Sequence, residues 1–285
     1  MQVGFIGVGA MGSAMAQHCS TAGFKVCAYD ADPDSLAKAC QNGVVPAASI
    51  AEMAKIIDVA VIMVANDAQS RAVTRVLLDG DLRKGAVIVV AATNHPRTMI
   101  DLDAECAKKN VGFVDAPVCY GLQGALQGEL ISLCGGRAQN IATITPVLKA
   151  YSRSVEHIGP TGCGQIGKTC NNMMHWAACV ANYETLALAK ACGINAQAMR
   201  ETLLKCPARN TTLERWDTSK FTWQEKDMDV ALEIAQSAGL SLPLFGVIDQ
   251  LVKRIGPKDV HALLHEENAA YLGLPITPQK LDQVV

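Results

Sequence analysis

The chain of 285 residues has no surplus of positive charge, because 25 Lys and Arg residues are balanced by 27 Asp and Glu residues, for a formal net charge of -2. A protein that neutralises a phosphate backbone needs excess cations, so we expect no nucleic-acid partner. Only 18% of the residues are charged and 50% are hydrophobic, which excludes the composition of intrinsic disorder. The sequence therefore predicts a folded chain with a sizeable buried core.

Long apolar runs are also missing. The longest, residues 59–65 and 86–92, are far shorter than the ~20 residues that cross a bilayer, so no membrane partner is expected. Residues 1–6 lack the basic region of a signal peptide and lead directly into a glycine motif. We therefore expect a cytoplasmic protein.

Eleven cysteines are present, but no two form a C-x-x-C pair. This absence disfavours a zinc site, and we predict no bound metal. An odd number of cysteines scattered through an apolar chain is typical of small buried side chains in a reducing compartment, not of a disulfide framework.

Short apolar runs alternate with helical patterns through residues 2–158. The candidate strands are residues 2–6, 25–29, 58–64, 86–91 and 111–115. The candidate helices between them are residues 11–22, 33–41, 67–78 and 96–108. Several of the strands are apolar without alternation, as expected when crossover helices cover both faces of a parallel sheet. The first half is predicted to be a doubly wound α/β domain.

The strand signal disappears after Gly162. Residues 165–192 contain no proline and are followed by Gly193, which predicts one long interdomain helix. Shorter helices are expected at residues 196–205, 223–238, 243–255 and 258–271. We predict a dinucleotide-binding domain at 1–161 and an all-α substrate and dimerisation domain at 162–285. The apolar linking helix indicates a subunit interface, and hence at least a dimer.

The first candidate strand runs into a glycine-rich turn that matches G-x-G-x-x-G and opens a helix. Its residues, all predicted to bind a cofactor, are Gly7, Val8, Gly9, Ala10, Met11 and Gly12. In this motif the first glycine permits the tight turn, the second lets the backbone approach a pyrophosphate, and the third lets helix and strand pack closely.

Asp30 ends the second candidate strand, at the distance of about 20 residues at which such motifs carry an acid. Its carboxylate can accept hydrogen bonds from ribose hydroxyls and would repel a 2′-phosphate, so we predict NAD over NADP. The alternative role for Asp30 is a cap for the turn before Asp32 and Pro33.

Three further segments complete a pattern that spans nearly the whole chain. They are D-A-P-V-C-Y-G at 115–121 with Gly124 and Gly128, G-C-G at 162–164 with Lys168, Asn171 and Asn172, and Lys226-Asp227. With the glycine turn, these blocks resemble the 3-hydroxyisobutyrate dehydrogenase family of β-hydroxyacid dehydrogenases. The resemblance implies NAD(P)-linked oxidation of a 3-hydroxy acid or the reverse reduction, a Rossmann domain followed by a helical domain, and a homodimer or homotetramer.

The resemblance makes Lys168 the catalytic residue, and chemistry supports the assignment. Oxidation of an alcohol by hydride loss requires the hydroxyl proton to leave, and a lysine can take that proton or return it in reduction. Asn171 and Asn172 lie three and four positions after Lys168, on the same face of a helix. Asn172 would hold the lysine or the substrate hydroxyl, and Asn171 would contact substrate. The alternative is an exposed lysine with two polar neighbours.

The expected substrate loop departs from the family pattern. Where the family usually has Ser and Gly after P-V, this chain has Cys119 and Tyr120, followed by Gly121. A thiol is a weaker hydrogen-bond donor than a hydroxyl, and Tyr120 adds a ring and a phenol. We expect all three residues to contact substrate, and the choice of substrate to be altered.

Three more residues are placed near the cofactor by the resemblance. Asn66 and Thr93 follow candidate strands, where loops at the carboxyl ends of a parallel sheet form the ligand crevice. Lys226 corresponds to a family lysine that approaches nicotinamide and substrate. For Lys226 the alternative is a solvated helix lysine paired with Glu225 or Asp229.

The leading hypothesis is an NAD-dependent oxidoreductase of a small 3-hydroxy acid or its semialdehyde or 2-oxo form. A second hypothesis is a reductase of a bulkier cyclic or aromatic ketone or imine, motivated by Cys119 and Tyr120. A third, from a different class, is a non-catalytic dinucleotide-binding sensor. The presence of Lys168 with its asparagines argues against the sensor, which needs no acid/base group.

Overall fold

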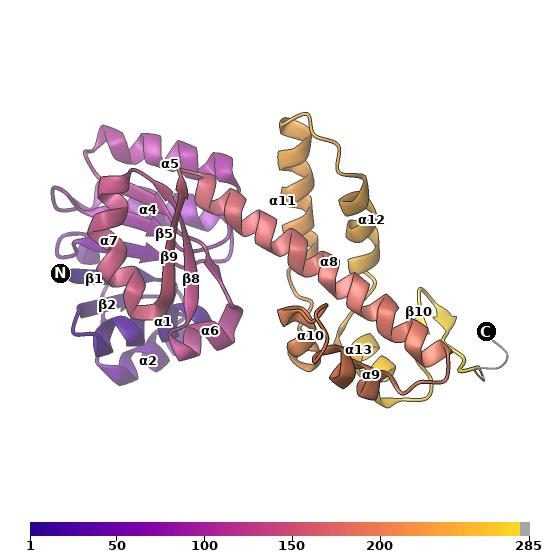
Figure 1. Ribbon diagram of the computed structural model, residues 1–285. Helices are drawn as coiled ribbons and strands as arrows, with labels where there is room; N and C mark the ends of the chain where they lie inside the picture. Colours follow the sequence, from indigo (N-terminus) through magenta and orange to yellow (C-terminus); the bar gives the residue numbers. More distant parts are fainter. Residues whose placement is uncertain (280–285) are drawn as a thin grey trace. The chain divides into compact units, whose positions relative to one another are not determined.

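The computed structural model describes residues 1–279, in two compact units. The first unit ends at Lys168 and the second begins at Thr169 (Figure 1). The first holds an α/β sheet and the second is built of helices, so the predicted fold class is confirmed.

The first unit is organised around a single nine-stranded sheet. Its strands are β1 (Gln2–Ile6), β2 (Lys25–Tyr29), β3 (Val45–Pro46), β4 (Val59–Ile62), β5 (Val87–Val90), β6 (Gly112–Asp115), β7 (Val118–Cys119), β8 (Leu130–Gly136) and β9 (Ser152–Gly159). The order is β3-β2-β1-β4-β5-β6-β8-β7, with β9 also paired to β8. The first six strands in this order, β3, β2, β1, β4, β5 and β6, are mutually parallel. β8 pairs with β6 in the antiparallel direction.

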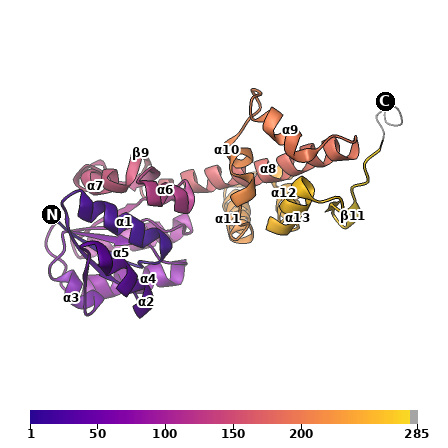
Figure 2. The ribbon, with the colours of Figure 1, turned by 90° about the horizontal axis from the view of Figure 1, so that it is seen from below.

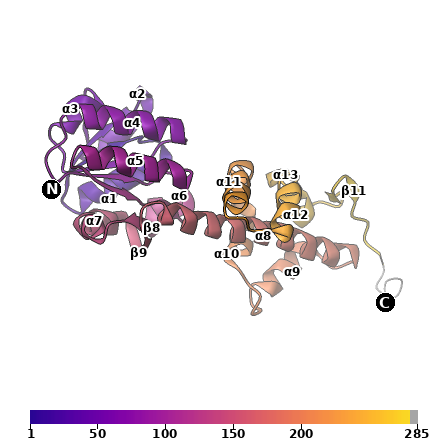
Figure 3. The ribbon, with the colours of Figure 1, turned by 90° about the horizontal axis from the view of Figure 1, so that it is seen from above.

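Helices cover both faces of this sheet. One layer contains α1 (Ala10–Thr21), α2 (Pro33–Ala39), α6 (Gly121–Gln127) and α7 (Ala138–Tyr151). The other contains α3 (Ile50–Ala54), α4 (Asp67–Asp79) and α5 (Pro96–Lys108), and Figure 3 shows these three on the side opposite α7.

The two layers explain why β4 and β5 are apolar at every position. In β4, Val59 and Val61 belong to the core beneath α1 and α7, whereas Ala60 and Ile62 belong to the core beneath α3, α4 and α5. Successive side chains of a strand point to opposite faces, so a sheet buried on both sides needs apolar residues throughout.

The strand order reverses between β1 and β4. β2 pairs with one side of β1 and β4 with the other, so the chain adds β2 and β3 in one direction across the sheet and β4, β5 and β6 in the other. In open α/β sheets, ligands bind outside the carboxyl ends of the strands at such a switch point. The turn that follows β1 lies there.

Sequence patterns identified five of the six parallel strands, β1, β2, β4, β5 and β6, but not the two-residue strands β3 and β7, nor β8 and β9. β9 reads S-R-S-V-E-H-I-G, and most of its residues are half-buried or exposed, because this strand lies at an edge of the sheet. β8 ends in two glycines, which are weak strand formers. Neither strand has the continuous apolar run that marks a doubly buried strand.

The second unit is arranged around the long helix α8 (Cys163–Ala191), which begins in the first unit. The shorter helices are α9 (Ala196–Leu203), α10 (Thr211–Glu214), α11 (Gln224–Ser237), α12 (Pro243–Val252) and α13 (Pro257–His265). Figure 2 shows α9 on one side of α8 and α11 on the other. Buried Tyr183, Leu186, Trp216 and Met228 belong to the apolar core of this unit.

The helix predicted at residues 258–271 is too long. α13 ends at His265, and a small antiparallel pair follows, β10 (Ala270–Tyr271) with β11 (Leu274–Pro275). Leu272 and Gly273 both have positive φ, the geometry of a two-residue hairpin turn. The positive φ at Leu272 is unusual for such a residue, which is why the sequence did not predict the hairpin.

Candidate functional site

The glycine turn after β1 is tightly packed at two of its three glycines. Gly7 has φ +87°, and a Cβ there would lie 2.3 Å from the Met63 carbonyl oxygen. A Cβ at Gly12 would lie 2.0 Å from the Gly7 carbonyl oxygen. At Gly9 a Cβ would meet nothing within 4 Å. The fold therefore requires glycine at 7 and 12, while the space before Gly9 is open.

Gly9 is also the N-cap of α1, and it supplies no side-chain cap. Ala10 is exposed and Met11 is half-buried, whereas Val8 is buried. The first N–H groups of a helix lack intrahelical acceptors and favour an anion. The open space at Gly9 and the uncapped start of α1 fit the pyrophosphate of a dinucleotide.

Asp30 follows β2 and is joined to the glycine turn. Its Oδ2 accepts a hydrogen bond from the Val8 N–H at 2.7 Å, and its Oδ1 accepts one from the Asp32 N–H at 2.9 Å. Asp32 caps α2 through the N–H groups of Asp34 and Ser35. Asp30 thus supports the local turn, and each of its oxygens keeps a second lone pair for a ribose hydroxyl.

Asn66 and Thr93 lie in loops after β4 and β5. Asn66 is exposed and caps α4, because its Oδ1 accepts a hydrogen bond from the Gln69 N–H at 2.9 Å. Thr93 is half-buried and stands between Ala92 and Asn94, whose backbone groups are both bound by the side chain of Gln165.

The expected substrate loop begins at β7, where Cys119 is buried. Tyr120 has φ +86°, a backbone conformation that few residues with a side chain adopt. The Arg153 guanidinium lies 4.3 Å from the centre of its ring, within the range of a cation–π contact. Gly121 is exposed and opens α6.

Lys168 lies beside this loop. Its Nζ is 4.0 Å from Cys119 Sγ, and the lysine side chain is half-buried. Burial raises the pKa of the Cys119 thiol, and the positive charge of Lys168 opposes that rise only in part. The thiol is therefore protonated at neutral pH, and the structure brings two sequence-predicted site residues together.

Asn171 and Asn172 follow Lys168 along α8. Asn171 is exposed and its Nδ2 donates to Asn172 Oδ1 at 3.1 Å, while Asn172 is buried. Lys226 lies in the second unit, on α11, with its Nζ 5.9 Å from the centre of the Trp223 ring. Beside it, Asp227 accepts a hydrogen bond from Trp176 Nε1 at 3.0 Å, which joins α11 to α8.

Sequence reasoning assigned no role to Asp115 or Gln165. Both are fully buried: Asp115 ends β6, and Gln165 lies in the first turn of α8. Burial raises the pKa of Asp115 to about 6, against the opposing effect of backbone N–H groups from residues 162, 164 and 165. The available signal was an acid at the end of a buried strand, immediately before the substrate loop.

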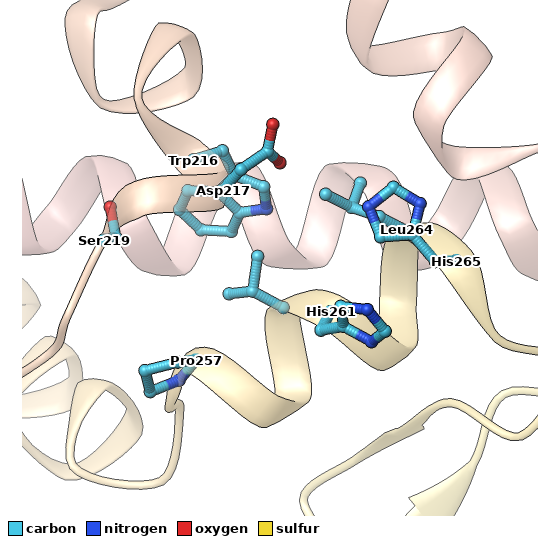
Figure 4. Close-up of a pocket in the computed structure, with 8 residues that line it drawn as sticks. Trp216, Asp217, Ser219, Pro257, His261, Leu264 and His265 are labelled. Atoms are coloured by element: carbon cyan, nitrogen blue, oxygen red, sulfur yellow. The ribbon is translucent and has the colours of Figure 1, made fainter.

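Two cavities are lined by other residues. One, of about 50 Å³ in the second unit, is lined by Trp216, Ser219, His261 and their neighbours (Figure 4). The other, of about 640 Å³ in the first unit, is lined by Arg137, His157 and neighbours. Neither contains a predicted site residue.

Within residues 1–279, no three His, Cys, Asp or Glu side chains gather in a way that could hold a metal ion. None of the helices in that range combines the length and the hydropathy that crossing a bilayer requires.

The chain matches two protein-family models. Residues 2–159 match the NAD binding domain of 6-phosphogluconate dehydrogenase. Residues 162–272 match the family described as NAD-binding of NADP-dependent 3-hydroxyisobutyrate dehydrogenase. Together the two matches run through both halves of the chain.

Individual relatives are also similar to this chain over most of its length. The NAD-dependent L-serine dehydrogenase of Pseudomonas aeruginosa is 28% identical over 267 residues, covering 85% of this chain and 88% of that protein. The 3-hydroxyisobutyrate dehydrogenase of the same organism is 27% identical over 264 residues, with the same coverage of 85% and 88%. The solved 3-hydroxyisobutyrate dehydrogenase of Salmonella typhimurium superimposes with a TM-score of 0.79 at 25% identity, covering 89% of this chain and 93% of that one.

Proposed function

Since the chain belongs to the 3-hydroxyisobutyrate dehydrogenase family, we propose that it transfers hydride between NAD(H) and a small 3-hydroxy acid, or its semialdehyde or 2-oxo form. The resemblance seen in the sequence is confirmed, and the chain is an NAD(P)-dependent dehydrogenase. The observation that carries the proposal is the lysine amine 4.0 Å from the substrate loop.

Lys168 is the general acid/base of the proposed reaction. When bound, the nicotinamide dinucleotide supplies the hydride acceptor. As the carbonyl forms, Lys168 Nζ takes the proton of the substrate hydroxyl, and in reduction it returns that proton. Asn172, buried one turn later on α8, holds the hydroxyl or the amine in place, and Asn171 contacts the substrate.

The proposed substrate class follows from the loop and from the relatives. L-Serine and 3-hydroxyisobutyrate both carry a primary alcohol one carbon away from the carbon bearing the carboxylate. In the family a serine hydroxyl usually binds that carboxylate, and here Cys119 and Tyr120 replace the serine and the glycine after it. The backbone around Gly121 therefore binds more of the substrate carboxylate in this chain. Lys226 adds positive charge for the carboxylate and borders the cofactor.

NAD is the proposed cofactor. The carboxylate of Asp30 lies beside the glycine turn, and residues 31–33 supply no cation to hold a 2′-phosphate. Asn66 and Thr93 border the cofactor from the β4 and β5 loops. We assign dinucleotide binding to residues 1–161, and substrate binding and subunit contact to residues 162–285.

A homodimer or homotetramer is the proposed assembly. Several large apolar side chains of the helical unit are exposed: Met174 and Leu188 on α8 are 71% and 67% exposed, and Leu244 and Val247 on α12 are 61% and 56% exposed. Exposed apolar residues on neighbouring helices favour contact with another subunit.

The second candidate function is reduction of a bulkier cyclic or aromatic ketone or imine. It is favoured by Tyr120, which places a half-buried ring beside the loop that holds Cys119. An aromatic ring can stack on a flat substrate, which a small hydroxy acid cannot exploit.

The test is turnover of a panel of substrates, measured as the change in NADH absorbance. Purified protein is mixed with NAD and small 3-hydroxy acids including L-serine, and with NADH and semialdehydes, 2-oxo acids and cyclic ketones or imines. Turnover on a small acid supports the leading proposal. Turnover confined to bulky carbonyls supports the second, and absence of turnover on the whole panel contradicts both.

A further inference from the structure

The first turn of α8 is held by one buried carboxylate. Asp115 Oδ1 accepts a hydrogen bond from the Gly162 N–H at 2.7 Å, and its Oδ2 accepts one from the Gln165 N–H at 2.9 Å. The Asp115 side chain has no exposed surface. A buried carboxylate that accepts helix N-terminal N–H groups stabilises that helix end through both hydrogen bonds and charge.

The surrounding backbone is shaped to admit this carboxylate. A Cβ at Gly135 would lie 2.5 Å from Asp115 Oδ1, and a Cβ at Gly164 would lie 2.7 Å from its Oδ2. Side chains at either glycine would occupy the space that the carboxylate fills. The site therefore fits an aspartate closely only because residues 135 and 164 are glycines.

Gln165 forms a second attachment on the same turn. Its Oε1 accepts a hydrogen bond from the Asn94 N–H at 2.9 Å, and its Nε2 donates to the Ala92 carbonyl at 2.9 Å. This fully buried amide spans the β5–α5 loop, which also contains Thr93. The start of α8 is thus tied to the ends of two neighbouring strands, β5 and β6.

We propose that Asp115 and Gln165 are positioning residues for Lys168, an inference that rests on the proposed function. Lys168 lies three residues after Gln165 on the same helix, and the chain reaches Cys119 four residues after Asp115. The Asp115 carboxylate therefore fixes both Lys168 and Cys119, whose Nζ and Sγ atoms lie 4.0 Å apart. The Gln165 amide fixes the start of α8 against the β5–α5 loop.

The first test is Asp115→Asn. The amide keeps the shape but offers one acceptor oxygen, and it turns an N–H group toward a backbone N–H. We expect kcat to fall by about ten- to a hundredfold, because a shift of about 1 Å in a catalytic group has that effect. KM and the Kd for NADH are expected to stay within about twofold. Asp101→Asn, in partly exposed ion pairs on α5, is the matched control.

The second variant is Gln165→Glu, which keeps the acceptor for Asn94 and places a carboxylate oxygen against the Ala92 carbonyl. It is expected to lower kcat and to raise the primary deuterium isotope effect on kcat, since a misplaced lysine slows the chemical step. Gln139→Glu, on the exposed face of α7, is its control. This variant keeps the proposal testable if Asp115→Asn does not fold.

Amide hydrogen exchange separates this proposal from the proposed function. Faster exchange in residues 162–168 of either variant supports the attachment even if the wild-type protein turns over no substrate, an outcome that would remove the proposed reaction alone. Wild-type exchange rates and wild-type kcat in both folded variants would overturn the positioning role.

Discussion

Lys168 Nζ and Cys119 Sγ lie 4.0 Å apart, and the two residues come from different parts of the first unit, α8 and β7. The thiol is buried and protonated, so it is a poor acceptor of a hydrogen bond from Lys168 Nζ. The amine is consequently available for a better partner, such as the hydroxyl of a substrate.

Lys168→Ala is predicted to lower kcat by about 10²- to 10⁴-fold, the usual effect of losing acid/base assistance. NADH affinity should be retained, because the dinucleotide is bound by the glycine turn. Stopped-flow turnover and fluorescence titration with NADH measure the two effects separately. Lys149→Ala on α7, an exposed lysine, provides the control and should behave as wild type. Undiminished turnover in Lys168→Ala would remove this residue from the reaction.

The double change Cys119→Ser with Tyr120→Gly restores the usual family residues in the substrate loop. A hydroxyl donates a stronger hydrogen bond than a thiol, and glycine adopts the positive φ of position 120 without strain. We expect kcat/KM for small 3-hydroxy acids to rise and any activity on bulky carbonyls to fall. The same substrate panel measures both, and an unchanged profile would show that neither residue selects the substrate.

Substitution by alanine should have different effects at two glycines of the turn: at Gly9 it should mainly weaken NADH binding, and at Gly12 it should mainly lower stability. Gly9→Ala should lower the free energy of unfolding by no more than about 1 kcal/mol, because its Cβ meets open space and only the N-cap preference for glycine over alanine is lost. It should weaken NADH binding at least about tenfold by obstructing the approach to the pyrophosphate. Gly12→Ala should cost about 3 kcal/mol or more, since its Cβ overlaps the Gly7 carbonyl. Urea unfolding and NADH titration of both variants provide the measurements.

Asp30 predicts the choice between the two dinucleotides. In Asp30→Ser the negative charge is removed while an oxygen remains, so kcat/KM with NADPH should rise at least about tenfold relative to that with NADH. Asp32→Ser keeps a side-chain oxygen at the cap of α2 and serves as the control. A wild-type enzyme that already prefers NADPH would contradict the assignment.

Asp115 predicts a pH dependence of stability. Its pKa is raised from 3.8 to about 6 in the folded chain, because burial disfavours the charged form. Its contribution to the free energy of unfolding is therefore fully present below pH 3.8 and is lost as pH rises to about 6, by roughly 3 kcal/mol. Urea unfolding of wild type and Asp115→Asn between pH 3 and about 8 isolates this difference.

Asp101 gives the opposite sign and so a useful comparison. Its hydrogen bond from Arg71 lowers the pKa of this carboxyl below 3.8. The stabilisation is present above pH 3.8 and is lost as pH falls through the lowered pKa. If Asp115→Asn and Asp101→Asn change the pH dependence in the same direction, the burial of Asp115 does not have the predicted effect.

Local patterns were sufficient for the five longer parallel strands, β1, β2, β4, β5 and β6, and for the glycine turn. Strands such as β4 and β5 are apolar throughout because both faces are covered, and that pattern is visible in a few residues. Gly7 takes a positive φ in the turn, and Gly12 is required by a close contact with the Gly7 carbonyl within the turn itself. These features depend on neighbouring residues, so sequence alone could predict them.

The contacts around Lys168 could not be predicted in this way. Asp115 bonds Gly162 across 47 positions, and Gln165 bonds Asn94 across 71. Such pairs depend on which strand ends meet in the folded sheet, and no local spacing encodes that. The resemblance supplied the lysine and its asparagines, but it did not supply the groups that hold their helix.

The burial of the cysteines has a practical consequence for spectroscopy. Burial raises the pKa of Cys19, Cys106 and Cys134 to about 12, so these thiols stay protonated and resist alkylation at neutral pH. Cys170 is exposed on α8, two positions after Lys168. A thiol-reactive fluorophore applied briefly to the native protein should attach there first, and its emission would report on the face of α8 turned away from the Lys168 side chain without an engineered label.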